Sequence, residues 1–558
     1  MKKSVTLIIS CVLCVVIAVV AYFWVTGMIS SNYAFRSPIK DTPPAPGQAL
    51  GESSTHRVVI VLIDALRYDT STSTAMPTLN QLREEGAQAK MHSQAPSFSE
   101  PGYTTILTGA WPWINDGPAF NLDYEEIPTW TQDNLFSAAH RAGLTTAISG
   151  YYWFEKLVPQ SDVDISFYTP GEDRKADEDV MAAALPMLKD NKAQLVLIHI
   201  DQVDYAGHHE GGPVSQNWTN AAKRADDMLA QVVSSLDLSK DTLLVLSDHG
   251  QINPGGHGGQ DPICLEEPFV LVGAGVVPGD YGDVNMVDVA PTLAALLGTN
   301  IPASTQGQVL TSMLQLPDSV KSAIPAAVEA QQAQLLNTFA SAINRKAGSY
   351  TVPTGSDVNQ YQTVMNELRQ SRQTSERIPR AIAAVLFVGL IIFWLVKNFK
   401  QGSIGWIIGG LVFVGLFYFV YAIWEQQGFS VSYIKSEPEL ILRVALTAAS
   451  VFVISFLMIF MDQKYFKYPP AEAVEKSLGL VLTTAFITGI PAILHFVING
   501  PLVTWTLPNY LVSFLFILSG IDLLVIAFVG LLFVWFTYAV SKKVNSPAVK
   551  KPAKKVAK

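Results

Sequence analysis

The chain has 558 residues, of which 49% are hydrophobic and 15% charged, and its formal net charge is −9. An average globular protein carries about 25% charged residues, so this composition excludes a wholly soluble chain. The negative balance argues against a general nucleic-acid binder, which needs a basic surface. Among its cysteines only Cys264 lies outside the first apolar run, which excludes disulfides and CxxC metal sites from the polar region.

The first predicted element is an apolar run over residues 5–29, after Met1-Lys2-Lys3. It is longer than the roughly 7–15 residues of a signal-peptide core, so we expect an uncleaved transmembrane helix. Most of the five later runs are close to the ~20 residues that cross a bilayer. These runs are 381–396, 404–424, 440–461, 478–498 and 511–540. The sequence therefore predicts an integral membrane protein with six spans, whose last span tilts or breaks near Gly520 and Asp522.

Basic residues predict the orientation of these spans, because lysine and arginine gather in cytoplasmic loops. Both termini are lysine-rich, which places the tail 542–558 in the cytoplasm and the polar region outside it. Four arginines just before the second span oppose this assignment: Arg369, Arg372, Arg377 and Arg380. The short loops and the lack of disulfides favour the periplasmic face of a bacterial inner membrane over an endoplasmic reticulum lumen.

The polar region alternates predicted strands with predicted helices, which is typical of an α/β fold with a largely parallel sheet flanked by helices. The β-branched runs 57–64, 145–148, 194–200, 242–247 and 269–272 predict strands, and 76–85, 131–142, 178–190 and 218–236 predict helices. Long polar helices at 319–345 and 357–377 predict a stalk. We therefore expect a transmembrane helix (1–30), a linker (31–56), a catalytic domain (57–315), a stalk (316–379), a five-helix membrane domain (380–541) and a basic tail (542–558).

Metal-ligand residue types follow three of the predicted strands. They are Asp64, then Asp204 and His208, then Asp248, His249 and His257. Each alone is most simply a turn or solvent-facing residue. Ligands bind at the carboxyl ends of strands in such sheets, however, and Asp and neutral His suit zinc or similar ions. Together these residues predict two adjacent metal sites of the kind that catalyse phosphoryl displacement.

Ser99 is the candidate nucleophile. It lies in a hydroxyl-rich turn before an apolar helix expected to begin near Pro101, and a serine there is ordinarily only an N-cap. Metal coordination would make the same hydroxyl a nucleophile at neutral pH, and the helix terminus would attract a phosphate.

At this point the chain resembles the alkaline phosphatase superfamily, in particular type I phosphodiesterases/nucleotide pyrophosphatases and glycosylphosphatidylinositol ethanolamine phosphate transferases. The segments that carry the resemblance are 61–69 (VLIDALRYD), 99–109 (SEPGYTTILTG), 204–208 (DYAGH), 247–250 (SDHG), 257–259 (HGG) and 286–298 (MVDVAPTLAALLG). The resemblance implies two divalent metal ions, zinc in this family. One site would comprise Asp204, His208 and His257, and the other Asp64, Asp248, His249 and Ser99. It also implies a phosphoseryl enzyme.

At two positions the sequence differs from the motifs of related enzymes, and these differences narrow the range of possible activities. The diesterases usually carry Asn three residues after the nucleophile, where this chain has Gly102. The sulfatase signature Cys/Ser-x-Pro-x-Arg has Tyr103 in place of its arginine, which argues against a sulfatase.

We therefore expect a membrane-anchored phosphodiesterase or phosphoethanolamine-type transferase that acts on a lipid- or envelope-linked phosphodiester, with no nucleic-acid partner. The alternatives are a nucleotide pyrophosphatase or phosphatase with a soluble substrate, and an inactive membrane assembly factor. The sequence leaves the acceptor and the oligomeric state open.

Overall fold

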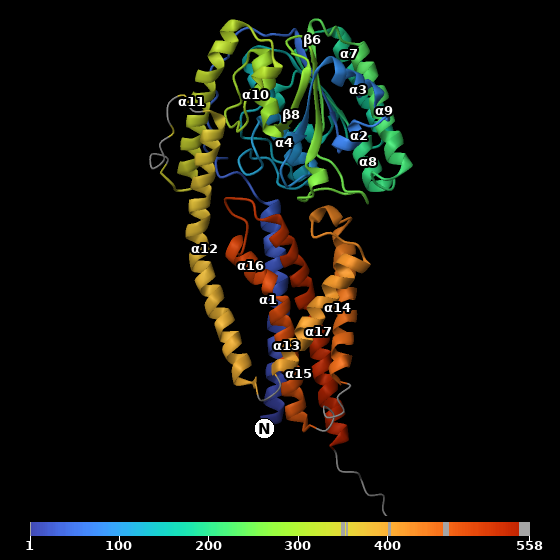
Figure 1. The fold of residues 1–558 in the computed structure, drawn as a ribbon, viewed down its shortest axis with the longest axis vertical. Coiled ribbons are helices and arrows are strands. Elements are labelled where there is room, and N and C mark those ends of the chain that lie inside the picture. Colours follow the sequence, from blue (N-terminus) through green and yellow to red (C-terminus); the bar gives the residue numbers. More distant parts are fainter. Residues whose placement is uncertain are drawn as a thin grey trace, which may run out of the picture.

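The computed structural model describes residues 2–346, 352, 355, 357–399, 403–460 and 468–545. An α/β domain forms one end of the elongated molecule, and long helices form the other (Figure 1). The N-terminus lies at the end of the helices far from the α/β domain. Residues 546–558 of the predicted basic tail lie outside the described residues.

The α/β domain is built on an eight-stranded mixed sheet with the strand order β4-β3-β5-β1-β6-β7-β2-β8. Only β7 runs antiparallel to its neighbours. The strands are β1 (Arg57–Ile63), β2 (Ala87–His92), β3 (Thr146–Tyr151), β4 (Ile165–Thr169), β5 (Leu195–Ile200), β6 (Asp241–Leu246), β7 (Glu266–Gly273) and β8 (Gly279–Asn285). The predicted α/β class with a largely parallel sheet is confirmed.

Helices cover both faces of the sheet. Alternate residues of β1 explain this arrangement: Val58, Ile60 and Leu62 face one apolar core, while Val59 and Val61 face another. The first core includes residues of α4 (Ser99–Thr108), α5 (Leu135–Arg141) and α10 (Val289–Leu297). The second includes residues of α3 (Pro77–Glu85), α7 (Arg174–Asp190) and α9 (Gln216–Ser234). A strand buried on both faces reads as a continuous apolar run, which is why β1 was predictable.

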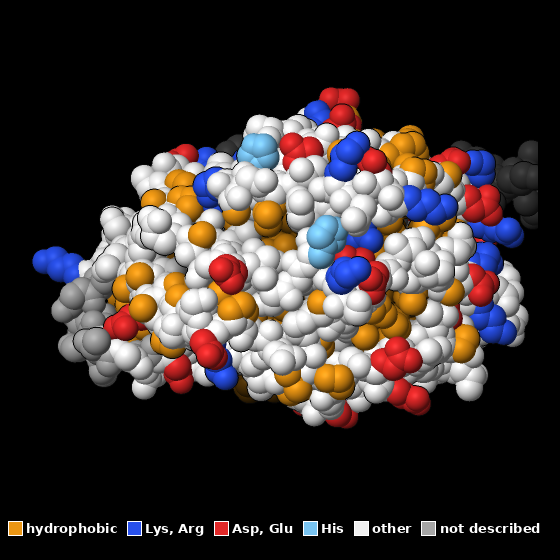
Figure 2. Space-filling view, turned by 90° about the horizontal axis from the view of Figure 1, so that it is seen from above, with side chains coloured by type: hydrophobic (Ala, Val, Ile, Leu, Met, Phe, Trp, Pro, Cys, Tyr) orange, Lys and Arg blue, Asp and Glu red, His pale blue; other side chains and the backbone are white. Residues whose placement is uncertain are grey.

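Short elements complete this domain: α2 (Tyr68–Ser71), α6 (Trp153–Leu157), α8 (Gln202–His209), and the 3-10 turns η1 (Tyr124–Glu126), η2 (Gln160–Asp162), η3 (Pro262–Cys264), η4 (Met286–Asp288) and η5 (Thr311–Met313). Seen from above, acidic, basic and apolar side chains are interspersed over the end of the domain that faces away from the long helices (Figure 2). The carboxyl ends of the central strands face the long helices instead (Figure 1).

Three strands escaped the sequence analysis, namely β2, β4 and β8. In β2 only alternate residues are buried, and in β8 nearly all are exposed. The helix predicted at 131–142 begins only at Leu135, because the side chain of Asn134 caps it by accepting a hydrogen bond from the Ser137 N–H. The helix predicted at 178–190 begins earlier, at Arg174, where Asp173 caps it in the same way.

Within the described residues, six helical segments are long and apolar enough to cross a membrane, as expected for an integral membrane protein. The long helices are α1 (Lys2–Tyr33), α11 (Asp318–Ala342), α12 (Val358–Lys397), α13 (Ser403–Phe419), α14 (Glu437–Phe460), α15 (Pro470–Thr488), α16 (Ile490–Ile498) and α17 (Tyr510–Val544). A π-helical turn, η8 (Val420–Trp424), extends α13, and η9 (Val431–Tyr433) lies between α13 and α14.

The long helices differ from the predicted spans in three places. The second polar helix and the second span form one continuous helix, α12, which runs through Pro379, so the predicted boundary between stalk and membrane domain falls inside it. The span predicted at 478–498 is divided at Gly489 into α15 and α16. The last span does not break: at Gly520 an added Cβ would lie 2.2 Å from Val25 of α1, so this glycine permits close helix packing.

Candidate active site

The predicted ligands meet at the carboxyl end of the sheet. Asp64 directly follows β1, and Asp248 and His249 follow the neighbouring strand β6. The two segments are joined by hydrogen bonds from the Ala65 N–H to Asp248 Oδ1 (3.2 Å) and from the Leu66 N–H to the Ser247 hydroxyl (2.8 Å). Parallel pairing of β1 and β6 therefore places two carboxylates from distant segments side by side.

Asp204 and His208 lie four residues apart on α8, so they share one face of that helix. The buried carboxylate of Asp177 on α7 fixes the start of α8, because it accepts hydrogen bonds from the Asp201 N–H (2.8 Å) and the Gln202 N–H (3.1 Å). This N-terminal contact directs Asp204 and His208 toward the ends of β1 and β6.

His257 completes the first cluster of ligand atoms. Its Nε2 lies 2.9 Å from the Nε2 of His208 and 3.5 Å from Asp204 Oδ1, and His208 Nε2 lies 3.5 Å from Asp204 Oδ2. The Nδ1 of His257 contacts the Ser97 carbonyl at 2.8 Å, which fixes the ring and leaves Nε2 free to act as a ligand. Two imidazole nitrogens and one carboxylate thus converge as an Asp-His-His metal site would require.

The second cluster lies deeper and is joined to the first by Asp204. Asp64, Asp204 and His249 offer ligand atoms within 4.8 Å of one another. His249 Nε2 lies 3.5 Å from Asp64 Oδ1 and 3.4 Å from Asp248 Oδ2. The placement of Asp204 between the two groups is new relative to the sequence analysis, which assigned it to one site only.

The donor set fits two divalent cations. Asp64 Oδ1 and Asp248 Oδ2 are buried and have no hydrogen-bond partner within the described residues. Burial, and then the neighbouring Asp64 carboxylate, raise the pKa of Asp248 well above its ordinary value. Burial also acts to raise the pKa of Asp204, but His208, His257 and His249 outweigh it and hold that pKa below its ordinary value. Buried carboxylates without partners are costly, and a bound cation would relieve that cost.

Ser99 is the first residue of α4 rather than its N-cap, which is Phe98. The first helical hydrogen bond runs from the Gly102 N–H to the Phe98 carbonyl (3.0 Å). The helix α4 therefore begins two residues before the start predicted near Pro101. The Ser99 hydroxyl lies 3.1 Å from His249 Nε2, so it adjoins the second cluster. All the predicted ligands and the predicted nucleophile therefore lie in one contiguous group.

Gly102 lies against the Asp248 segment. A Cβ at this position would lie 2.8 Å from Asp248 Cβ and 2.9 Å from the Asp248 carbonyl oxygen. The asparagine of the diesterase pattern has no space here, because the first turn of α4 packs directly on the backbone of a candidate ligand.

Sequence reasoning missed two residues that hold Asp64. His199 of β5 lies 3.0 Å from Asp64 Oδ2, and the Tyr103 hydroxyl of α4 donates a hydrogen bond to the same oxygen and lies 2.9 Å from His199 Nε2. Both are buried. The signal for His199 is its pairing with Leu62 in the β1–β5 register, which brings it close to Asp64. This signal can be used only when the order of the strands in the sheet is known.

The membrane helices reach this site through the connection between α13 and α14. The Ser432 hydroxyl of η9 accepts a hydrogen bond from the Gly259 N–H (3.0 Å), and the Gln260 amide donates to the Phe429 carbonyl (3.1 Å). The Ser430 hydroxyl donates to Asp261 Oδ2 (2.5 Å). The loop that carries His257 is therefore held from both the α/β domain and the helical bundle.

Parts of this chain are similar to known proteins. Residues 58–298 match the family model described as type I phosphodiesterase / nucleotide pyrophosphatase. The human GPI ethanolamine phosphate transferase 2 catalytic subunit is 28% identical over 303 residues, which cover 49% of this chain and 30% of that protein. The human GPI ethanolamine phosphate transferase 3 catalytic subunit is 24% identical over 374 residues, covering 61% of this chain and 33% of that protein. The chain thus spans about a third of the length of these relatives.

Solved structures that match part of this chain include murine ectonucleotide pyrophosphatase/phosphodiesterase 5, with 14% identity and a TM-score of 0.38, covering 44% of this chain and 96% of that one. Another is an alkaline phosphatase superfamily protein from Vibrio parahaemolyticus, with 18% identity and a TM-score of 0.37, covering 52% and 79%. Residues 58–298 of the α/β domain are thus similar to type I phosphodiesterases / nucleotide pyrophosphatases, and the matched part of the chain is similar to GPI ethanolamine phosphate transferases.

Proposed function

We propose that the protein is a metal-dependent phosphotransferase that moves a phosphoethanolamine-type group from a membrane lipid phosphodiester through a phosphoseryl enzyme. The observation that carries this proposal is the position of Ser99, whose hydroxyl lies 3.1 Å from His249 within the Asp/His group at the start of α4. The similarity to the transferases named above supports the choice of transferred group.

The proposed ligands form two sites. Asp204, His208 and His257 would hold one ion, and Asp64, Asp248, His249 and Ser99 the other. Oxygen and imidazole donors favour zinc. Two such ions would supply positive charge that stabilises the attacking and departing oxygens of an in-line displacement.

The chain's own residues would perform the transfer in two steps. In the first, Ser99 Oγ loses its proton and attacks phosphorus, the bond from phosphorus to the donor alcohol oxygen breaks, and that oxygen takes up a proton. In the second, the acceptor hydroxyl loses its proton and attacks phosphorus, the bond from phosphorus to Ser99 Oγ breaks, and Ser99 Oγ regains a proton. Tyr103 and His199 would hold the Asp64 carboxylate in position throughout.

The membrane helices support a lipid substrate. The hydrogen bonds of the α13–α14 connection join the His257 loop to the helical bundle, where a lipid head group would be presented. The lysine-rich ends of the chain support an extracytoplasmic catalytic domain, and its lack of disulfides suits the periplasmic face of a bacterial inner membrane. Water as the acceptor would make the enzyme a phosphodiesterase.

The test uses the full chain, purified in detergent with zinc and incubated with phosphatidylethanolamine labelled in its ethanolamine. We expect labelled phosphoethanolamine on Ser99 by mass spectrometry, and its loss in Ser99→Ala. Ser161→Ala, which removes an exposed hydroxyl, is the matched control and should label normally. Release of free phosphoethanolamine without an added alcohol would identify hydrolysis. Neither release nor transfer would refute the lipid substrate, and full activity in Ser99→Ala would refute the covalent step.

A further inference from the structure

A polar cavity that none of the proposed metal ligands lines lies where the α/β domain meets the membrane helices. It has a volume of about 570 Å³. Its walls come from the end of the polar half of α12, from the connection between α16 and α17, and from Trp113 and Gln94 of the α/β domain. The cavity therefore lies at the level where the chain changes from polar to apolar helix.

The cavity contains unbalanced positive charge. Its lining includes Arg369, Arg377 and Arg380 but only one acidic residue, Glu376. Glu376 is already occupied: it accepts hydrogen bonds from Arg380 (3.1 Å) and from Arg372, outside the lining (3.1 Å). Within the described part of the chain, Arg369 and Arg377 form no ion pair.

The Trp505 indole N–H also donates to Glu376 (3.1 Å), so three donors share this one carboxylate: Trp505, Arg372 and Arg380. The Nε of Arg377 donates to the Ile498 carbonyl (3.0 Å), which anchors the side chain to the end of α16. The Arg369 guanidinium lies over the Trp113 ring, 4.8 Å from its centroid. These contacts hold the two unpaired arginines in place without neutralising them.

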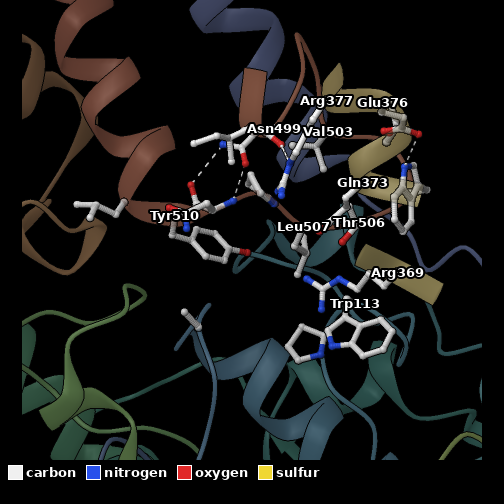
Figure 3. Close-up of a pocket in the computed structure, with 18 of the residues that line it drawn as sticks. Trp113, Arg369, Gln373, Glu376, Arg377, Asn499, Val503, Thr506, Leu507 and Tyr510 are labelled. Carbon is white, nitrogen blue, oxygen red and sulfur yellow. Dashed lines mark hydrogen bonds between the residues drawn. The ribbon is translucent and has the colours of Figure 1, made fainter. Parts of the chain in front are cut away.

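Polar atoms without partners point to a missing ligand. Arg369 Nε, Thr506 Oγ1 and the Tyr510 hydroxyl are buried and form no hydrogen bond within the described residues. Figure 3 shows Arg369 and Tyr510 on opposite sides of the cavity, with Thr506 on the same side as Arg369. A guanidinium and two hydroxyls around one space are donors for an oxyanion, and arginine pairs well with phosphate oxygens.

The membrane side of the cavity favours a lipid over a free anion. Below the arginines α12 becomes apolar from Ala381. None of the residues in the most apolar stretch of this helix is buried within the protein. Figure 1 shows this part of α12 running apart from the other membrane helices below α16. Acyl chains can therefore lie along α12 beneath the cavity, and Trp113, Trp505 and Tyr510 occupy the interfacial level that such residues prefer.

We propose that this cavity binds the phosphate group of a membrane phospholipid, with Arg369 and Arg377 as the principal contacts and with Thr506 and Tyr510 as further donors. The site requires neither the metal ions nor Ser99, so it does not rest on the proposed function. It also gives a reason for the arginines that oppose the positive-inside pattern: they bind a head group instead of setting the topology.

The test measures binding by the full chain in detergent after chelation of its metals, so that the catalytic centre cannot contribute. The probes are dihexanoyl phosphatidylglycerol, inorganic phosphate and dihexanoylglycerol, titrated calorimetrically. We expect the phospholipid to bind, and Arg369→Gln and Arg377→Gln each to weaken its binding about tenfold or more, the loss of one hydrogen bond to a charged group. Arg443→Gln, which alters an arginine of α14 paired with Glu439, is the matched control and should bind normally.

Three results would overturn the proposal. They are unchanged phospholipid binding in both arginine variants, binding of dihexanoylglycerol as tight as that of the phospholipid, and equally tight binding of inorganic phosphate, which would identify a site for free anions. Thermal unfolding of the metal-free Arg369→Gln protein at the wild-type temperature would show that the variant is folded. Because the binding assay uses metal-free protein, its result is independent of whether Ser99 proves catalytic.

Discussion

Replacement of Gly102 by alanine tests whether the close contact between α4 and the Asp248 segment sets the geometry of the metal centre. The added methyl carbon would lie 2.8 Å from Asp248 Cβ and 2.9 Å from the Asp248 carbonyl oxygen. Ordinary carbon contacts begin near 3.5 Å, so one segment must move by roughly 0.7 Å. Overpacking of this kind costs about 1–3 kcal/mol, and displacement of a positioned group by about 1 Å can lower a rate about 100-fold. We expect kcat/KM to fall about 10- to 100-fold, together with weaker binding of the metal that we propose Asp248 holds.

The assay is hydrolysis of bis(4-nitrophenyl) phosphate by zinc-loaded protein, with the metal content of each variant measured by mass spectrometry. Gly47→Ala is the matched control, because a Cβ at Gly47 meets no atom within 4 Å, and it should behave as the wild type. Full activity and full metal content in Gly102→Ala would show that the Asp248 segment yields freely, and the argument from close packing would then be wrong.

Two further predictions concern the loop that carries His257 and the buried carboxylates. Ser432→Val removes the acceptor of the Gly259 N–H, so we expect lower zinc affinity and slower hydrolysis of the soluble diester. Ser436→Ala in the same connection is the control and should change neither quantity. Equal behaviour of the two variants would contradict the idea that Ser432 holds the His257 loop in position. In metal-free protein the raised pKa of Asp248 means that the folded state binds more protons than the unfolded state, so stability should fall as pH rises through that folded-state pKa. Thermal unfolding of the chelated protein over a pH series measures whether stability falls or rises with pH. Added zinc should reduce the loss of stability at high pH. A stability that rises with pH over this interval would refute the raised pKa of Asp248.

The sequence predicts those parts of the fold whose local pattern and final environment agree. The strands at 57–64 and 194–200 are buried on both faces, and their apolar runs show it. The strand β2 is not predictable in this way, because Ala87–His92 alternates short and polar residues and is placed by pairing with β7 and β8. A continuous α12 was equally hidden, since its polar and apolar halves carry opposite patterns on one helix.

The residues of the candidate site also fall into two groups, those that the sequence alone could predict and those that it could not. Asp64, Asp248 and His249 could be proposed because the end of a strand is visible in sequence. His199 and Tyr103 could not, because they read as core residues until the register of β1 and β5 and the approach of α4 bring them to Asp64. The departure at Gly102 is likewise explained by a contact with a segment almost 150 residues later, which no local pattern contains.

The contacts between η9 and the His257 loop bear on why this domain is joined to a helical bundle instead of a single anchor. His257 is held on one side by the Ser97 carbonyl of the segment leading to Ser99, and its loop is held on the other side by Ser432 between two membrane helices. A shift of α13 against α14 therefore moves the same loop that positions a candidate metal ligand. A lone anchor would bring the domain to the membrane but could not transmit such a shift. The bundle thus contacts the loop that carries His257, and changes in how α13 and α14 pack against each other should alter hydrolysis of even a soluble diester.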